Sequence, residues 1–118
     1  MTTATEYTLA ELMICAASKA FSNEGEALAT GIGVIPRLAA SLCMKTDNFD
    51  LMMTDSEAYM LSEPNPLGVR GADFVQKNES WMGFSRIFDN VWSGKRHAML
   101  GPVQIDQYGQ TNTSVMGG

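Results

Sequence analysis

Residues 26–40 read EALATGIGVIPRLAA, and this stretch passes from a strand through a glycine turn into a helix. EALAT ends at Thr30 and is typical of a short strand, and GIGVIP follows it directly. Pro36 suits the first turn of a helix, where its missing N–H is not needed, and an apolar face with helical spacing follows it. The stretch therefore predicts one strand-to-helix unit of an α/β fold.

A helix is also expected before this unit, beginning at Thr8. Thr8 and Glu11 have the spacing of a capping box, in which a hydroxyl and a carboxylate each satisfy a free backbone amide. Asn23 and Gly25 supply the stop. Residues at helical spacing between these signals form one apolar stripe: Leu9, Leu12, Met13, Ala16, Ala17 and Ala20.

Beyond residue 46 the chain continues to alternate between strand and helix. Residues 51–53 predict a buried strand with the polar exit TDSE, and residues 64–71, PNPLGVRG, predict a loop. A third helix marked by Phe84 and Val91 should end at residues 93–94, before a strand over 97–100. This alternation favours an α/β architecture with a layered, mostly parallel open sheet and helices on both faces.

Composition limits the classes of function. The chain has 118 residues, of which 45% are hydrophobic, so it can form one domain with a core. Its net charge of −5 and its scattered Lys and Arg residues argue against binding to nucleic acid or to an anionic membrane. No apolar run approaches a membrane span, and the N-terminus lacks the features of a signal peptide. We therefore expect a cytoplasmic protein.

The cysteines and the single histidine do not predict a metal site. Cys15 and Cys43 both fall within apolar helical patterns, where a free thiol behaves as a small hydrophobe. Two such cysteines form neither a disulfide framework nor a zinc cluster, so no metal is expected. His97 lies in the apolar-flanked run KRHAML, which favours a core or hydrogen-bonding histidine.

Three loops are expected to meet at one edge of the sheet, because ligands of open α/β sheets bind at the carboxyl ends of the strands. These loops are GIGVIP after EALAT, TDSEAYML after the strand at 51–53, and GPVQIDQYG after residue 100. The third loop holds a buried-looking residue, Ile105, between polar neighbours. We expect it to lie beside the other two.

The first loop can supply backbone amides. Around Gly31, Ile32 and Gly33 a turn can point amides outward, to stabilise a developing oxyanion or to hold a phosphate. The alternative is tight strand-to-helix packing, with glycine chosen only for its backbone freedom.

The second loop can supply carboxylates. Asp55 and Glu57 follow a buried-looking strand, where at least one of them can serve as a nucleophile or base. If a helix begins there instead, both carboxylates interact favourably with the positive end of the helix dipole and have no catalytic role.

These loops, in this order, resemble the β subunit of class I coenzyme A transferases of the glutaconate type, from about residue 7 to residue 118. The resemblance is carried by TGIGVIPRLAA, LMMTDSEAYML, the GF of WMGFSRIF and, above all, GPVQIDQYGQTN, which is similar to the family pattern G-x-x-Q-x-D-x-x-G-x-x-N. It implies a CoA-transferase-like fold, of which residues 1–118 are the N-terminal part of a single domain. The resemblance also implies that the rest of the family domain is absent from this chain.

Within that family, LMMTDSEAYMLSEPNP and NESWMGFSRIFDNVWSGKRHA are similar to actinobacterial hydrolases that open a steroid ring during cholesterol catabolism. This resemblance implies a heteromer with an α subunit, expected to be α2β2, and a CoA thioester carrying a cyclic diketone as the substrate. Coenzyme A would enter as part of that substrate, with no permanently bound cofactor. The main acid/base group would come from the partner subunit.

The resemblance also assigns roles to the candidate residues. Amides from Gly31 to Gly33 should face the thioester carbonyl. Residues of the third loop should keep the site rigid: Gln104 and Asp106 by hydrogen bonds across adjacent loops, Gly109 by closing the Tyr108–Gly109 turn, and Asn112 by holding that turn in place.

One departure from the family pattern decides between activities. Transferases attack the thioester with a glutamate, whereas the matching position here is Asp55, with Glu57 two residues later. An aspartate is shorter by about one bond, and misplacement by about an ångström costs roughly 10²-fold in rate. Hydrolysis is therefore favoured, with Asp55 positioning water or substrate. Two alternatives remain open: a transferase that tolerates Asp55, and a noncatalytic scaffold that completes an α subunit.

Overall fold

The structure of the chain is a computed structural model that describes residues 6–25, 28–30, 33–55, 58–68, 70–75, 77–99 and 101–115. Three helices lie within these ranges: α1 (Leu9–Phe21), α2 (Val34–Thr46) and α3 (Gly83–Trp92). The strands are β1 (Leu28–Thr30), β2 (Met52–Asp55), β3 (Tyr59–Leu61), β4 (Ser80–Trp81), β5 (Arg96–Ala98), β6 (Gln104–Ile105) and β7 (Thr111–Asn112).

Local sequence signals explain where the first two helices begin. The Thr8 N–H donates to the Glu11 carboxylate at 2.7 Å, and the Glu11 N–H donates to the Thr8 hydroxyl oxygen at 3.3 Å. This confirms the capping box at the start of α1. Gly33 caps α2 and places Pro36 within the first turn, where a missing N–H costs no helical hydrogen bond.

Five strands form one mixed sheet in the order β4-β3-β2-β1-β5. Strand β1 pairs in parallel with both β2 and β5, whereas β3 pairs antiparallel with β2 and β4 pairs antiparallel with β3. The expectation of a mostly parallel sheet is therefore wrong for β3 and β4. Only residues 56–58 separate β2 from β3, which is too few for the crossover that a parallel pair needs, so this half of the sheet is antiparallel.

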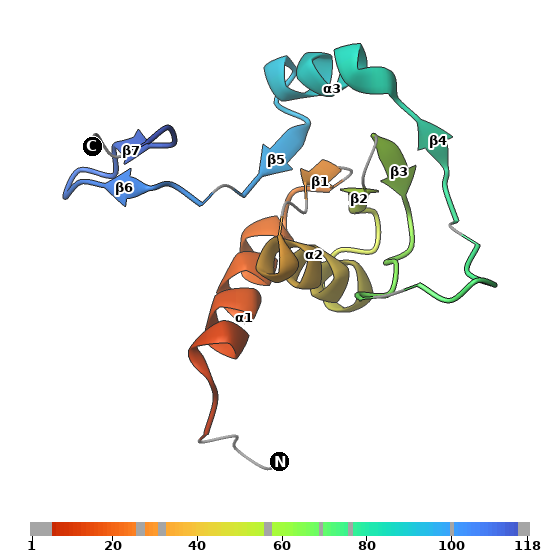
Figure 1. Ribbon diagram of the computed structural model, residues 1–118, viewed down its shortest axis with the longest axis horizontal. Helices are drawn as coiled ribbons and strands as arrows, with labels where there is room; N and C mark the ends of the chain where they lie inside the picture. Colours follow the sequence, from red (N-terminus) through yellow and green to blue (C-terminus); the bar gives the residue numbers. More distant parts are fainter. Residues whose placement is uncertain are drawn as a thin grey trace.

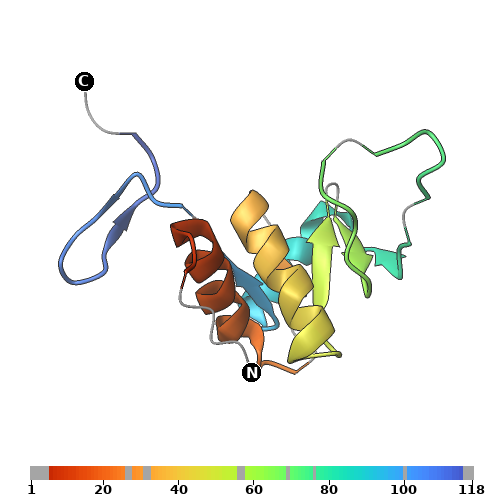
Figure 2. The ribbon, with the colours of Figure 1, turned by 90° about the horizontal axis from the view of Figure 1, so that it is seen from below.

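Helices lie on either side of this sheet. Figure 1 shows α1 and α2 on one side of the strands and α3 on the other, beside β5. Figure 2, which is turned by 90°, shows α1 and α2 next to each other in front of the strands. The strands that alternate with helices, β1, β2 and β5, are the three that pair in parallel.

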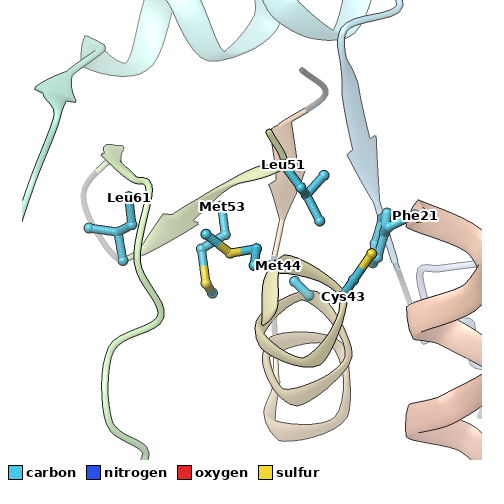
Figure 3. Close-up of a cluster of buried hydrophobic side chains, with 7 residues drawn as sticks. Phe21, Cys43, Met44, Leu51, Met53 and Leu61 are labelled. Carbon is cyan, nitrogen blue, oxygen red and sulfur yellow. The ribbon is translucent and has the colours of Figure 1, made fainter. Parts of the chain in front are cut away.

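The main hydrophobic core lies between α2 and the sheet (Figure 3). Its largest fully buried side chains are Leu51, Met53, Leu61 and Cys43. The end of α1 closes the core with Phe21, and Asn48 fixes that end by donating to the Phe21 and Gly25 carbonyl oxygens at 3.1 and 3.0 Å. The predicted buried strand at 51–53 is therefore confirmed, and β2 extends it as far as Asp55.

The apolar stripe of α1 is exposed along most of its length. Leu9 is 72% exposed and Leu12 is 48% exposed, and the buried residues of the helix are Ser18 and Phe21. Helix α1 packs against α2 at its C-terminal end, so the beginning of the stripe extends beyond the core. Cys15, expected to pack as a small hydrophobe, is also exposed, whereas Cys43 is buried.

Residues 101–112 form a separate two-stranded sheet that the sequence did not predict. Strands β6 and β7 pair antiparallel, with Gln104 opposite Asn112 and Ile105 opposite Thr111. Figure 1 shows this hairpin extending away from the five-stranded sheet. Ile105 is 66% exposed, which corrects the expectation that it is buried.

Among the helices that the structure describes, none combines the length and apolar character needed to cross a bilayer.

Candidate functional site

The carboxyl ends of three parallel strands meet at one edge of the sheet. The register places Thr30, at the end of β1, beside Thr54 of β2 and Ala98 of β5. Chain segments that leave these strands therefore begin at the same edge. They lead to Gly33 and α2, to the turn after Asp55, and to Met99. Two of the three predicted loops are thus brought together by the fold.

Gly33 has the backbone conformation that the glycine turn requires. Its φ of +96° lies in the region that L side chains rarely adopt, and it is the N-cap of α2 with no side-chain cap. Because glycine has no side chain, Gly33 cannot cover the amides of the first helical turn with a capping hydrogen bond. Such amides suit a developing negative charge. Gly31 and Ile32, which were assigned the same role, lie outside the described residues.

Asp55 closes β2, and its backbone pairs with Tyr59 across the turn to β3. The structure describes this backbone but not the Asp55 side chain, and Glu57 lies outside the described residues. Because the strand continues to Asp55, a helix does not begin at this residue. The alternative in which Asp55 occupies a helix N-terminus is therefore wrong.

The turn after Asp55 rests on a segment that sequence reasoning left unassigned. The Met82 N–H donates to the Ala58 carbonyl oxygen at 3.0 Å, and the Glu79 N–H donates to the Met60 carbonyl oxygen at 2.9 Å. Ala58 and Met82 are buried together, with Met52 and Met60 packed against them. Two of the motifs that carry the family resemblance, TDSEAYML and WMGF, are thus adjacent in space.

Asp106 organises the β6–β7 hairpin. Its Oδ1 accepts hydrogen bonds from the backbone N–H groups of Tyr108 and Gln110 at 2.8 and 2.9 Å. Gly109 has a φ of +83° and donates its N–H to the Asp106 carbonyl oxygen at 3.1 Å. A carboxylate that accepts two backbone amides in a turn holds that turn in one conformation.

Asn112 joins the two strands of the same hairpin. Its Nδ2 donates to Gln104 Oε1 at 3.0 Å, and its Oδ1 accepts from the Ser114 N–H at 3.0 Å. These hydrogen bonds of Gln104, Asp106, Gly109 and Asn112 all remain within residues 101–115, although Gln104 and Asp106 were expected to bond across to neighbouring loops. Whether these residues support a reaction site stays a prediction.

Two cavities lie near the predicted loops, and they are chemically different. An open, largely apolar groove of about 550 Å³ lies between α1, the first turn of α2 and the segment after β5, and it is lined by Met13, Ala16, Ala17, Ile35, Pro36, Met99 and Gly101. A polar hollow of about 410 Å³ lies within the hairpin and is lined by residues from Gln104 to Asn112. Among the residues whose side chains the structure describes, the groove takes lining from the first loop, through Ile35 and Pro36, and from the start of the third, through Gly101.

Three residues of the apolar groove belong to loops that the sequence predicted at the ligand-binding edge: Ile35 and Pro36 to GIGVIP, and Gly101 to GPVQIDQYG. Met13, Ala16 and Ala17 were predicted only as part of an apolar helix stripe. Position in the sequence could have indicated the groove. Pro36 follows the glycine turn, and Met99 follows the last parallel strand, so both lie near the carboxyl ends of the strands.

His97 and Cys43 are titratable residues outside the predicted loops, and their surroundings suit a structural role. His97 Nε2 lies 3.3 Å from Glu24 Oε2, and both side chains are about two-fifths exposed. His97 is therefore half-buried beside a carboxylate and is not a core residue, and the expectation of a hydrogen-bonding histidine stays a prediction. Burial raises the pKa of the Cys43 thiol, and the nearby charge of Asp47 raises it further, so the reactive thiolate is disfavoured. The described residues contain no group of three or more potential metal ligands.

Comparison with known proteins identifies similar sequences. The IpdB subunit of the cholesterol ring-cleaving hydrolase of Rhodococcus jostii (strain RHA1) is 36% identical over 115 residues, which cover 98% of this chain and 44% of that protein. The subunit of the same name from Mycobacterium tuberculosis (strain ATCC 25618 / H37Rv) is 34% identical over 110 residues, covering 93% of this chain and 43% of that protein. No family model matches the chain.

A solved structure is similar as well. A chain in the crystal structure of Rhodococcus jostii RHA1 IpdAB superimposes with a TM-score of 0.82 at 36% sequence identity, covering 97% of this chain and 44% of that one. This chain therefore spans somewhat less than half the length of the relatives it matches. Over that length, in sequence and in backbone fold, it resembles the IpdB subunit of a cholesterol ring-cleaving hydrolase.

Proposed function

We propose that this chain is part of the β subunit of a heteromeric hydrolase that opens a cyclic-diketone ring of a steroid-derived CoA thioester. The observation that carries this proposal is the similarity to IpdB over nearly the whole chain, at 36% identity and a TM-score of 0.82. The relatives come from Rhodococcus and Mycobacterium, which supports a role in actinobacterial cholesterol catabolism.

The proposed reaction needs water, a stabilised oxyanion and a proton donor. Water adds to one ring carbonyl, the bond to the adjacent carbon breaks, and the electron pair left on that carbon is delocalised into the second carbonyl. Protonation then gives a carboxylic acid and a ketone. Coenzyme A remains attached throughout as part of the substrate, so we propose no permanently bound cofactor.

Residues of this chain would form one wall of that site. The amides from Gly31 to Gly33 would face the thioester carbonyl, and the left-handed backbone of Gly33 is compatible with such a turn. Asp55 would position water or substrate, with Glu57 as the second candidate carboxylate. The main acid/base group would belong to the α partner, in an α2β2 assembly. The expected cytoplasmic location stays a prediction.

The apolar groove supports a substrate with a hydrophobic ring system. Ligand sites are commonly cavities of about 300–1,000 Å³ with mostly apolar walls. The groove of about 550 Å³ falls within this range, and Ile35 and Pro36 in its wall directly follow the glycine turn. A ring system bound there would lie beside the first turn of α2, which directly follows the glycine turn.

The experiment is a turnover assay of the assembled complex on a cyclic-diketone CoA ester, with and without an added carboxylic acid acceptor. The proposal predicts ring opening in water alone and no dependence on the acceptor. Hydroxylamine or borohydride should trap no covalent adduct, because Asp55 is not expected to act as a nucleophile. CoA exchange with ping-pong kinetics, or an adduct on Asp55 or Glu57, would identify a transferase instead.

The scaffold alternative has one observation in its favour. The side-chain hydrogen bonds of Asp106 and Asn112 stay within the hairpin, which is what a structural element requires. A scaffold predicts that replacing Gly33 and Asp55 together changes assembly but not the rate. The hydrolase predicts a loss of rate in an assembled complex.

A further inference from the structure

Small side chains of α1 form one wall of the apolar groove. Met13, Ala16 and Ala17 line the groove from this helix. Residues three and four positions apart lie on the same face of a helix, so these three side chains stand together. Two of them are single methyl groups, and Ile35 and Pro36 of α2 also line the groove. The width of the groove therefore depends on how little the side chains of α1 project into it.

The groove lies beside the edge of the sheet where ligands of such folds bind. Pro36 follows the glycine turn at the start of α2, and Met99 directly follows β5. The carboxyl ends of parallel strands are the usual ligand-binding edge of an open α/β sheet. This position favours a ligand, rather than a protein segment, as the occupant of the groove.

The described walls of the groove select a ligand by its size. The lining residues are alanine, methionine, isoleucine, proline and glycine, and none of these described residues has a charged, hydroxyl or amide side chain. An apolar pocket distinguishes ligands that differ by one methylene by about 10- to 200-fold. Selection in this groove therefore depends on the space that its walls leave.

That space suits a ligand larger than a single ring. A cavity of about 150 Å³ is sufficient to hold one benzene molecule. The groove of about 550 Å³ has room for a fused ring system. Met13 and Met99 can follow the outline of such a ligand, because methionine side chains are unbranched and flexible.

We propose that Ala16 and Ala17 are specificity-determining residues of the hydrolase: their small side chains make room in the groove for a fused ring system, which larger side chains would exclude. This inference rests on the proposed function, because it assigns the groove to the substrate of that reaction. It adds the residues that set the size of the ring system. Leucine at either position would extend into the groove and narrow it.

Two substrates of different size test the proposal in the assembled complex. In Ala16→Leu, kcat/KM for the CoA ester of a fused bicyclic diketone should fall about 10-fold or more, mainly through a higher KM. The CoA ester of a monocyclic diketone should be turned over nearly as before, because a smaller ring still fits. Ala17→Leu should have the same effects. Ala10→Leu, at an exposed residue of the same helix that does not line the groove, is the matched control and should change neither substrate.

A compensating substitution shows whether size is the cause. Met13→Ala removes a long side chain from the same wall, one position short of a helical turn before Ala16. Combined with Ala16→Leu, it should restore kcat/KM for the bicyclic ester several-fold, because it returns space to the groove. A loss that the second substitution does not reduce would contradict selection by size.

Binding without turnover provides an independent readout. Met13 and Met99 both line the groove, so methionine labelled with ¹³C in its methyl group reports on occupancy by NMR. Titration of the complex with a decalone, a saturated bicyclic ketone without coenzyme A, should shift these two methyl signals. The signal of Met60, which packs against a different cluster, should stay in place. The shifts should weaken in Ala16→Leu.

Three results would overturn the inference. The first is unchanged selectivity in Ala16→Leu, and the second is an absence of methyl shifts at Met13 and Met99. The third is a failure of the Ala16→Leu subunits to assemble in gel filtration, which would mean that a protein segment covers the groove. A wild-type complex without ring-opening activity would refute the proposed function instead. In that case, methyl shifts that weaken in Ala16→Leu would still support a size-selective groove, and their absence would refute it as well.

Discussion

The five-stranded sheet and the β6–β7 hairpin are stabilised by different interactions. In the sheet region Leu51, Met53 and Leu61 are at most 1% exposed and pack under α2. In the hairpin every described residue from 101 to 115 is exposed except Asn112, which is half-buried. The hairpin is held instead by the Asp106 carboxylate and by the Asn112 to Gln104 bond.

This difference has consequences for function. Burial makes the sheet rigid, so loops at its carboxyl edge start from fixed positions. A two-stranded hairpin without a covered face is only marginally stable in water. Its polar motif, which resembles the family pattern most specifically, therefore depends on hydrogen bonds within the turn for its shape.

The largest expected effect is on stability. Leu51→Ala should lower the free energy of unfolding by about 2–5 kcal/mol, because it leaves a cavity in the core. Ile105→Ala, in the exposed hairpin, is the matched control and should change the free energy by less than about 0.5 kcal/mol. Chemical denaturation measures both values. Equal losses from the two substitutions would show that the hairpin is part of the core.

The next effect is on turnover at the sheet edge. Gly33→Val places a β-branched residue at a φ of +96°, so the turn before α2 should be distorted. We expect turnover to fall by about 100-fold or more while the subunits still assemble, as gel filtration would show. Gly71→Val is the control, because a Cβ there meets no atom within 4 Å and its φ is not left-handed. Retained activity in Gly33→Val would count against the role of the turn.

A smaller effect is expected in the hairpin. Asp106→Ala removes the acceptor of two backbone N–H groups, so the amides of Tyr108 and Gln110 should exchange faster with solvent. The free energy of global unfolding should change by less than about 1 kcal/mol, because the hairpin buries little surface. Asp73→Ala, at another exposed aspartate, should leave those two amides unchanged. Unchanged exchange in the Asp106 variant would mean that other contacts hold the turn.

The smallest effect concerns pH at the exposed start of α1. Hydrogen bonds from the Thr8 N–H and hydroxyl lower the pKa of Glu11 below its ordinary value of 4.5. A lowered folded-state pKa stabilises the protein above pH 4.5, and this stability is lost as the pH falls through the folded value. The difference in Tm between wild type and Glu11→Gln should therefore shrink as the pH falls below 4.5. A difference independent of pH would contradict the assignment.

The sequence predicted the elements whose signals are local. The capping box at Thr8 marks the start of α1, and Pro36 marks the first turn of α2, because both act within a few residues. The paired strands β3 and β4 were missed, since their two or three residues acquire strand geometry only through pairing with β2 and with each other. The hairpin was missed for the same reason, although the Tyr108–Gly109 turn within it was predicted.

The candidate site was predictable in part. Strand order placed Gly33 and Asp55 at one edge, because parallel strands share their carboxyl ends. The position of the third loop could not be predicted, because nothing in GPVQIDQYG indicates that it folds on itself rather than against its neighbours. The α1 stripe shows a similar limit, since helical spacing predicts an apolar face but not what covers it.

Turnover of the assembled complex in ¹⁸O-labelled water, followed by mass spectrometry of the product, tests the central proposal most directly. A ring-opening hydrolase should place one labelled oxygen in the new carboxylate of a product that still carries coenzyme A. Unlabelled product, or transfer of coenzyme A to an added acid, would contradict the account.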